Sequence, residues 1–305
     1  MRFTIYQESR QGGRSNNEDR TTYCYSRDAL MMVVADGMGG HHYGEVAAQI
    51  AIQTLADNFQ REAKPSISDP FRFLQKAMTN AHHAILDYSA RHHLSDTPRT
   101  TCVACVIQDS VAYWAHAGDS RLFLMRAGKV IAQTKDHSRI RLMIEEGLLT
   151  EAQAAVHPDR NKIYSCLGSP TPPEIEFSRK TPLAHGDIVL LCTDGLWGVT
   201  SGDLMAVALK GANLLQAVPM LLSQAEVKGG PNGDNLSVVA VRWEESYVEE
   251  LSSAISTQTM AMNEVTTRLE EFGRNPAYKS DLTDDEIEKA IEEIRAAIDK
   301  YTPPK

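Results

Sequence analysis

The sequence lacks any apolar run that could cross a bilayer, since its longest uninterrupted apolar stretch is Ala29–Ala35. The first residues, MRFTIYQESRQGG, soon turn polar and do not contain the apolar core of a secretory signal. These two absences predict a soluble chain that works in the cytoplasm and does not contact a membrane.

Cysteine is scarce, with five in 305 residues, and the odd number argues against a disulfide scaffold. Cys102 and Cys105 have the C-x-x-C spacing of a zinc or redox motif, but no second pair follows them. The surrounding segment TTCVACVI is typical of a half-buried strand in which cysteine serves as a small apolar residue. We therefore interpret this pair as part of a strand.

An excess of positive charge is also missing. The chain has 31 Lys and Arg against 40 Asp and Glu, a formal net charge of −9. No basic stripe is present that could follow a phosphate backbone, so nucleic acid is not expected as a partner. The 42% hydrophobic and 23% charged residues are usual for a globular protein.

The acidic excess is concentrated after Trp243, where the residue pattern also changes. Residues 244–305 hold 15 acidic and 7 basic residues, whereas the first 243 are nearly balanced. Apolar residues recur every three or four positions over 248–272 and again over 287–301, which predicts an acidic helical hairpin over 244–305. Its apolar seams could pack on each other, pack on the preceding domain, or support self-association or partner binding.

The first 243 residues consist mainly of short apolar runs punctuated by Gly, Asp and Asn. Two longer helical patterns, near 43–61 and 70–92, interrupt them. Because strands outnumber helices, a mainly antiparallel sheet system fits better than a regular alternation of strands and helices. The expected strands are 2–8, 21–26, 30–35, 101–107, 111–117, 121–126, 174–180, 187–193 and 235–242.

Several apolar runs end in an aspartate beside Gly or Asn. The segments are VVADGMGG, AGDSR, LLCTDG and GGPNGDN, and Asn17-Glu18-Asp19 precedes the second strand. Each Asp-Gly pair alone is an ordinary turn signal. Together, carboxylates at the tips of buried strands would repel one another unless a cation neutralised them. Mg²⁺ and Mn²⁺ prefer such oxygen ligands, so the set indicates a dinuclear metal site.

The glycine run after Asp36 superficially suits a phosphate-binding loop between a strand and a helix. It lacks the Lys-Ser/Thr of a P-loop, and its glycines do not match G-x-G-x-x-G. We therefore expect no nucleotide cofactor.

Eight short motifs follow one another in an order that resembles the metal-dependent type 2C protein serine/threonine phosphatases, over about residues 3–243. They are Arg14 with Asn17-Glu18-Asp19, VADGMGGHHYGE, RTTC, AHAGDSRLF, TKDHS, HPDRNKIYSCLG, LLCTDGLWGV and GGPNGDNLSVVAV. The bacterial single-domain members look most similar, with a flap at about 139–166. The resemblance implies an α+β fold, in which a central β-sandwich of two mainly antiparallel sheets is flanked by helix pairs. It also implies that residues 1–243 are the catalytic domain.

The resemblance further implies which residues hold metal ions. Asp36 would bridge two Mn²⁺ or Mg²⁺ ions, Gly37 would offer its carbonyl oxygen, and Asp194 and Asp234 would complete the protein ligands. Asp119 resembles the ligand of a weaker third ion.

Three more residues take part by the same resemblance. Arg14 would grip the phosphate of the substrate, while Glu18 and Asp19 would orient water at the metals. A guanidinium suits the first task because it can contact two phosphate oxygens at once.

The implied activity is hydrolysis of phosphoserine and phosphothreonine on proteins, opposing a bacterial Ser/Thr kinase. A metal-activated water attacks the phosphate, and no phosphoenzyme forms. The alternative is a pseudophosphatase or scaffold that acts through its helical tail.

Overall fold

The structure is a computed structural model that describes residues 1–38, 43–150, 153–154, 157–159 and 162–245. The helical hairpin expected over 244–305 lies outside the described residues from position 246 onward. The hairpin and the domain boundary after residue 243 therefore stay predictions.

One of the two sheets contains five antiparallel strands in the order β1-β11-β10-β6-β7. The central strand β10 pairs with β11 on one side and β6 on the other. The strands of this sheet are β1 (Phe3–Arg10), β6 (Arg121–Arg126), β7 (Lys129–Gln133), β10 (Ile188–Cys192) and β11 (Leu236–Trp243).

The second sheet has the order β2-β3-β4-β5-β8, with β9 also pairing with β5. Every side chain of β3 is buried, because helices cover one face of this sheet and the other sheet covers the opposite face. The strands are β2 (Arg20–Tyr25), β3 (Ala29–Ala35), β4 (Cys102–Gln108), β5 (Val111–Ala117), β8 (Glu176–Phe177) and β9 (Thr181–Pro182).

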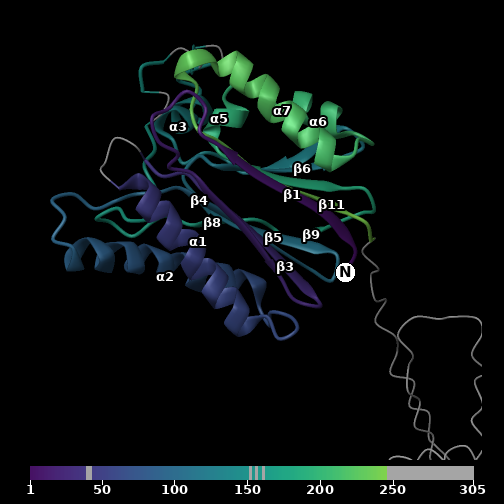
Figure 1. Cartoon of the computed structure of the whole chain (residues 1–305), viewed down its shortest axis with the longest axis horizontal. Coiled ribbons are helices and arrows are strands. Elements are labelled where there is room, and N and C mark those ends of the chain that lie inside the picture. The colour runs from purple at the N-terminus through teal and green to yellow at the C-terminus, as the bar shows by residue number, and fades with distance from the viewer. Residues whose placement is uncertain (39–42, 151–152, 155–156, 160–161, 246–305) are drawn as a thin grey trace, which may run out of the picture. The chain divides into compact units, whose positions relative to one another are not determined.

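The two sheets face each other, and helices cover both outer faces (Figure 1). Side chains from both sheets form the middle core, with Trp243 fully buried in it. Helices α1 (Gly44–Glu62) and α2 (Pro70–Arg91) cover the second sheet, and α6 (Gly202–Leu209) and α7 (Leu214–Gly229) cover the first. Shorter helical turns are α3 (Arg139–Glu145), α5 (Asp194–Trp197) and η1 (Gly230–Asn232).

Local sequence signals explain where the covering helices begin. Asp69 caps α2 by accepting a hydrogen bond from the backbone N–H of Arg72 (3.1 Å), and Pro70 occupies the first helical position. Ser201 and Asn213 cap α6 and α7 in the same way. These caps satisfy amide groups that the first turn of a helix leaves without partners.

The expected α+β sandwich is confirmed, with differences in detail. Most expected strands agree with the structure to within two residues, but 174–180 contains only the two-residue strand β8. The residue pattern did not locate β7, α6 or α7. Among the described helices, none combines the length and the apolar character that crossing a bilayer requires.

Candidate active site

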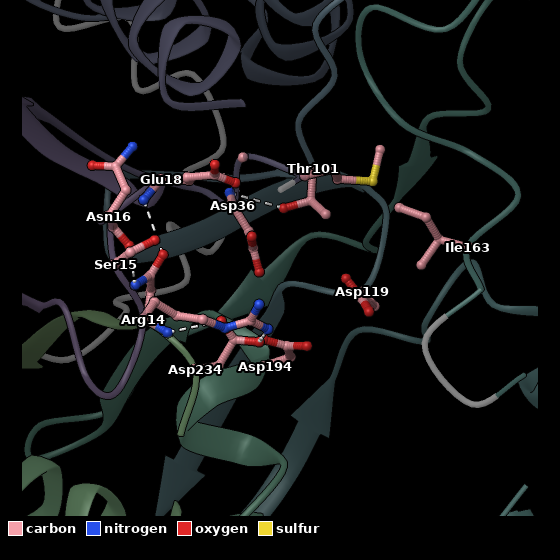
Figure 2. A pocket seen from close by; sticks show the side chains of 13 residues that line it. Arg14, Ser15, Asn16, Glu18, Asp36, Thr101, Asp119, Ile163, Asp194 and Asp234 are labelled. Carbon is pink, nitrogen blue, oxygen red and sulfur yellow. Dashed lines mark hydrogen bonds and ion pairs between the residues drawn. The ribbon is translucent and has the colours of Figure 1, made fainter. Parts of the chain in front are cut away.

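A cavity of about 350 Å³, here called the acid cavity, lies where strands of both sheets end (Figure 2). Seven of the eight residues predicted for the site line it; Asp19 does not. The lining residues are Arg14, Ser15, Asn16, Glu18, Asp36, Gly37, Met38, Thr101, Asp119, Ile163, Asp194, Asp234 and Asn235.

Four aspartates bring carboxylates to the acid cavity from different strand ends. Asp36 directly follows β3, and Asp119 lies in the turn between β5 and β6. Asp194 begins α5 just after β10, and Asp234 comes shortly before β11. The antiparallel pairing of β10 with β11 explains why the last two are neighbours, since the end of one strand lies beside the start of the other.

Burial and mutual repulsion make these carboxyl groups hard to ionise together. Burial, followed by the charges of the neighbouring aspartates, raises the pKa of Asp36 well above its usual value. Burial raises the pKa of Asp119 in the same way, with Asp194 as its first acidic neighbour. For Asp194 itself, burial and then Asp234 raise the pKa to about 6. Such a set fits divalent cations, which would compensate the charge of oxygen ligands in a buried site.

Asp19 lies behind the acid cavity and is 2% exposed. Its Oδ2 accepts a hydrogen bond from Oγ1 of Thr193 (2.8 Å), the residue just before Asp194. Burial raises the pKa of Asp19 to about 7, although the hydrogen bonds from Thr193 and Ser237 act against this shift. The carboxylate is thus placed to hold the chain at Asp194.

Tight backbone packing fixes the position of Asp36. A Cβ atom at Gly37 would lie 2.4 Å from the backbone of Gly44 and 2.7 Å from the carbonyl oxygen of Glu18, so no larger residue fits there. The backbone N–H of Asp36 donates a hydrogen bond to Oγ1 of Thr101 (3.1 Å). The first aspartate is therefore held by neighbours on both sides.

Arg14 is the one cation that contacts an aspartate of the acid cavity by a hydrogen bond in the described residues. Its Nη2 donates to Oδ2 of Asp234 at 2.6 Å, and its side chain remains 55% exposed (Figure 2). This hydrogen bond, and the charge of Asp234 with it, raises the pKa of Arg14. The guanidinium was predicted to face a phosphate, but here one of its nitrogens engages a predicted metal ligand.

Glu18 lines the acid cavity with its side chain, and its backbone is held by a residue that the sequence analysis did not single out. The backbone N–H of Glu18 donates to Oδ1 of Asn235 (2.9 Å). The Asn235 amide in turn donates to the carbonyl oxygens of Gln11 and Asn16 at 2.7 and 2.9 Å. Asn235 thereby ties the loop after β1 to the loop before β11. The sequence signal that could have identified Asn235 is its position as a polar residue directly before the buried strand β11.

Trp197 was also missed, although it contacts the segment that carries Asp119. Its indole Nε1–H donates to the carbonyl oxygen of Asp119 (2.9 Å). Arg121 stacks over its ring at 3.5 Å and forms two 2.7 Å hydrogen bonds with Asp136. Asp119 is therefore supported by α5 as well as by its own turn.

The described parts of the expected flap at 139–166 begin and end near the acid cavity. Ser138 forms an antiparallel bridge with Ile163, and the Ile163 side chain lines the cavity (Figure 2). Helix α3 begins directly after Ser138, which caps it by accepting a hydrogen bond from the backbone N–H of Arg141 (3.2 Å). Movement of this segment as a flap stays a prediction.

Comparisons with known proteins agree with this fold and site. A curated serine/threonine phosphatase of Listeria monocytogenes is 29% identical over 231 residues, covering 75% of this chain and 90% of that protein. The crystal structure of the Mycobacterium tuberculosis serine/threonine phosphatase PstP/Ppp is 31% identical, with a TM-score of 0.68, over 80% of this chain and 99% of that one. A structure of the PstP catalytic domain in complex with two manganese ions is 30% identical, with a TM-score of 0.66, over the same shares.

The family comparison covers strands of both sheets, although not β11, and most of the acid cavity. The model of the protein phosphatase 2C family matches residues 7–206, which include six of the seven predicted site residues that line the cavity. The seventh, Asp234, lies beyond the match and completes the same cavity. Because the match spans well over half of the sequence, this chain belongs to the protein phosphatase 2C family.

Proposed function

We propose that this chain hydrolyses phosphoserine and phosphothreonine monoesters on proteins and that it depends on Mn²⁺ or Mg²⁺. The observation that carries the proposal is the convergence of four aspartates from both sheets on one cavity that also contains an arginine. The relatives named as serine/threonine phosphatases support the choice of substrate.

The proposed ligands of two cations are the carboxylates of Asp36, Asp194 and Asp234 with the carbonyl oxygen of Gly37. Asp119 is proposed to hold a weaker third ion. When bound, the cations would lower the pKa of a water so that it can lose a proton and attack near neutral pH. Their charge would also stabilise the phosphoryl oxygens. The manganese-containing relative supports the choice of metal, and the oxygen-only donor set supports hard divalent ions generally.

The remaining residues bind and orient. Asp19 is proposed to keep the Asp194 segment in place through Thr193, and Glu18 to orient water from the wall of the cavity. A cation at Asp234 would compete with the ion pair of Arg14, which would free the guanidinium for two oxygens of a phosphate. Metal binding at Asp234 would then make Arg14 available to bind the phosphate of the substrate.

The proposed partners are phosphorylated proteins and a Ser/Thr kinase whose action the phosphatase reverses. Self-association or partner binding through residues 244–305, and location in the cytoplasm, stay predictions from the sequence. The alternative, a scaffold that keeps the fold without catalysis, is not favoured, since every proposed metal-binding carboxylate is present and faces the same cavity.

The test is release of phosphate from a phosphothreonine peptide with Mn²⁺, with Mg²⁺ and with a chelator. The full chain should be active with either metal and inactive with the chelator, and Asp194→Asn should remove the activity. Asp203→Asn is the matched control because Asp203 is exposed in the first turn of α6, away from the acid cavity. A metal-saturated, folded chain that releases no phosphate would instead support the scaffold.

A further inference from the structure

Two buried histidines lie beside each other near the turn that carries Asp119, and each has an unused ring nitrogen. His116 on β5 and His137 after β7 are 2% and 1% exposed, and their ring centres are 4.5 Å apart. Within the described part of the chain, Nδ1 of His116 and Nε2 of His137 have no hydrogen-bond partner. Buried polar atoms usually have a partner, so this pair calls for an explanation.

A carboxylate completes the group. Glu176 on β8 pairs directly with His116 on β5, which brings both side chains to one face of the sheet. Its Oε2 lies 3.6 Å from Nε2 of His137. One ligand atom from each of the three residues lies within 4.8 Å of the other two. We call these three residues the histidine cluster.

We propose that the histidine cluster binds one transition-metal ion of the Zn²⁺ class, at a site separate from the acid cavity. Imidazole nitrogens favour such ions over Mg²⁺ and Ca²⁺, which take oxygen ligands. Two neutral imidazoles and one carboxylate carry a single negative charge, which compensates half of the charge of a divalent ion, as in the His₂Glu sites of zinc enzymes. Glu176 is 48% exposed, which leaves water free to complete the coordination.

The hydrogen bonds of the two rings decide which nitrogen can bind a metal. Nε2 of His116 contacts the carbonyl oxygen of Lys135 at 2.6 Å. Because a carbonyl only accepts, Nε2 carries the proton and Nδ1 presents its lone pair to the cluster. A backbone carbonyl that orients a ring in this way is a common support for a metal-binding histidine. Burial also lowers the pKa of His116, which keeps the ring neutral and able to bind.

His137 needs one rearrangement. Its Nδ1 accepts a hydrogen bond from the backbone N–H of Gly118 at 3.4 Å, so the proton of the neutral ring lies on Nε2. Metal binding through Nε2 would move this proton to Nδ1 with no net exchange with solvent, and the long bond from Gly118 would break. The donor atoms would also approach to about 3.4 Å, the spacing of ligands around tetrahedral zinc. Small side-chain rotations suffice for this approach from a spread of 4.8 Å or less.

The experiment measures Zn²⁺ binding to the full chain in excess Mg²⁺, which occupies oxygen sites without competing for imidazole. Competition with a chromophoric chelator gives the affinity, and Co²⁺ absorption reports nitrogen ligation. One equivalent of Zn²⁺ should bind, with His116→Gln removing it and Glu176→Gln weakening it at least about tenfold. His83→Gln is the matched control, since His83 is exposed and outside the cluster.

Two outcomes would overturn the proposal. One is the absence of a Zn²⁺ equivalent that resists Mg²⁺; the other is wild-type affinity in both His116→Gln and Glu176→Gln. His116→Gln alters a buried residue and could unfold the chain. Glu176→Gln should leave the fold intact, because it alters a half-exposed side chain at the sheet edge. A shift of the Gly118 amide resonance on Zn²⁺ addition, which needs a higher Zn²⁺ concentration in Glu176→Gln, would add direct support. The result is independent of phosphatase activity, so failure of one proposal leaves the other standing.

Discussion

The acid cavity and the histidine cluster lie on opposite sides of one short turn. Asp119 lines the acid cavity, while the preceding Gly118 donates its backbone N–H to His137. The first site contains only oxygen ligands and several negative charges in a space of about 350 Å³. The second contains two buried neutral imidazoles and one half-exposed carboxylate. Donor type, more than the number of ligating residues, separates a site for hard ions and phosphate from a site for a zinc-like ion.

The turn can serve both sites because its backbone is sharply constrained. Gly118 has φ of 110°, and a Cβ there would lie 2.7 Å from the side chain of Thr101. Thr101 also shares a 2.7 Å hydrogen bond with Ser120, on the other side of Asp119. The same constrained backbone therefore positions both the Asp119 carboxylate and the Gly118 N–H.

The largest expected effect is a loss of phosphopeptide turnover that leaves Zn²⁺ binding at the histidine cluster unchanged. Asp36→Asn removes one of the carboxylates proposed to hold the cations, so phosphopeptide turnover should fall by at least about 10²–10³-fold, the loss typical of removing one preorganised group that stabilises charge in a transition state. Zn²⁺ affinity of the histidine cluster in excess Mg²⁺ should not change. Steady-state kinetics and chelator competition on the same preparation give both values.

Asp109→Asn is the control for this variant. Asp109 is exposed in the turn between β4 and β5, and its φ of 54° is one that asparagine tolerates well. It should match the wild type in both assays. Retention of near-normal turnover by Asp36→Asn would remove Asp36 from the catalytic account and end the functional contrast between the two sites.

Seven of the eight residues predicted for the site line the acid cavity, because their sequence setting recurs along the chain. A single aspartate after an apolar run is an ordinary turn residue, but Asp36, Asp119 and Asp194 repeat the setting, and the repetition indicates a shared site. The sandwich fold was accessible for a similar reason, since β3, β4 and β10 are almost wholly apolar. Here composition and burial agree, so the pattern is easy to interpret.

Features that depend on distant contacts were not accessible. Asn235 acts through Gln11 and Asn16, more than 200 positions away, and Trp197 supports Asp119 from helix α5, 78 positions away. The helix α7 contains Pro219 and several exposed apolar residues, which obscures its period. The histidine cluster depends on pairing between β5 and the two-residue strand β8. No local pattern encodes these contacts.

An effect of intermediate size is expected in the pH dependence of the melting temperature, to which the two sites contribute with opposite signs. In metal-free protein, burial raises the pKa of Asp19 from 3.8 to about 7, so the stability linked to its protonated form is complete below 3.8 and is lost as the pH rises through 7. Burial lowers the pKa values of His116 and His137 from 6.5, so their contribution is lost as the pH falls below that value. In chelator, Asp19 should therefore lower the melting temperature between about pH 4 and 7, whereas the two histidines should raise it as the pH approaches 6.5 from below.

Asp19→Asn tests which site causes the alkaline loss. Removing the buried charge should flatten the decline of the melting temperature between about pH 4 and 7 in chelator. Mn²⁺ affinity should fall by about 10–100-fold, because the hydrogen bond that holds the Asp194 segment through Thr193 is no longer made to a charged group. Calorimetry with and without Mn²⁺ measures both. An unchanged decline together with unchanged Mn²⁺ affinity would show that Asp19 contributes to neither.

The smallest expected effect concerns the charge of the ligand sets, since Arg14 pairs with Asp234 in the acid cavity, whereas the histidine cluster consists of two imidazoles and one carboxylate. Arg14→Ala should raise the KM for a phosphopeptide by about tenfold, the equivalent of one charge-assisted contact of roughly 1.4 kcal/mol. Mn²⁺ affinity should stay the same or increase, because Asp234 no longer has Arg14 as a competing partner at 2.6 Å. Arg14→Lys keeps the charge but not the planar fork, so it should recover only part of the KM. A drop in Mn²⁺ affinity with an unchanged KM would mean that Arg14 organises the metal ligands and does not bind phosphate.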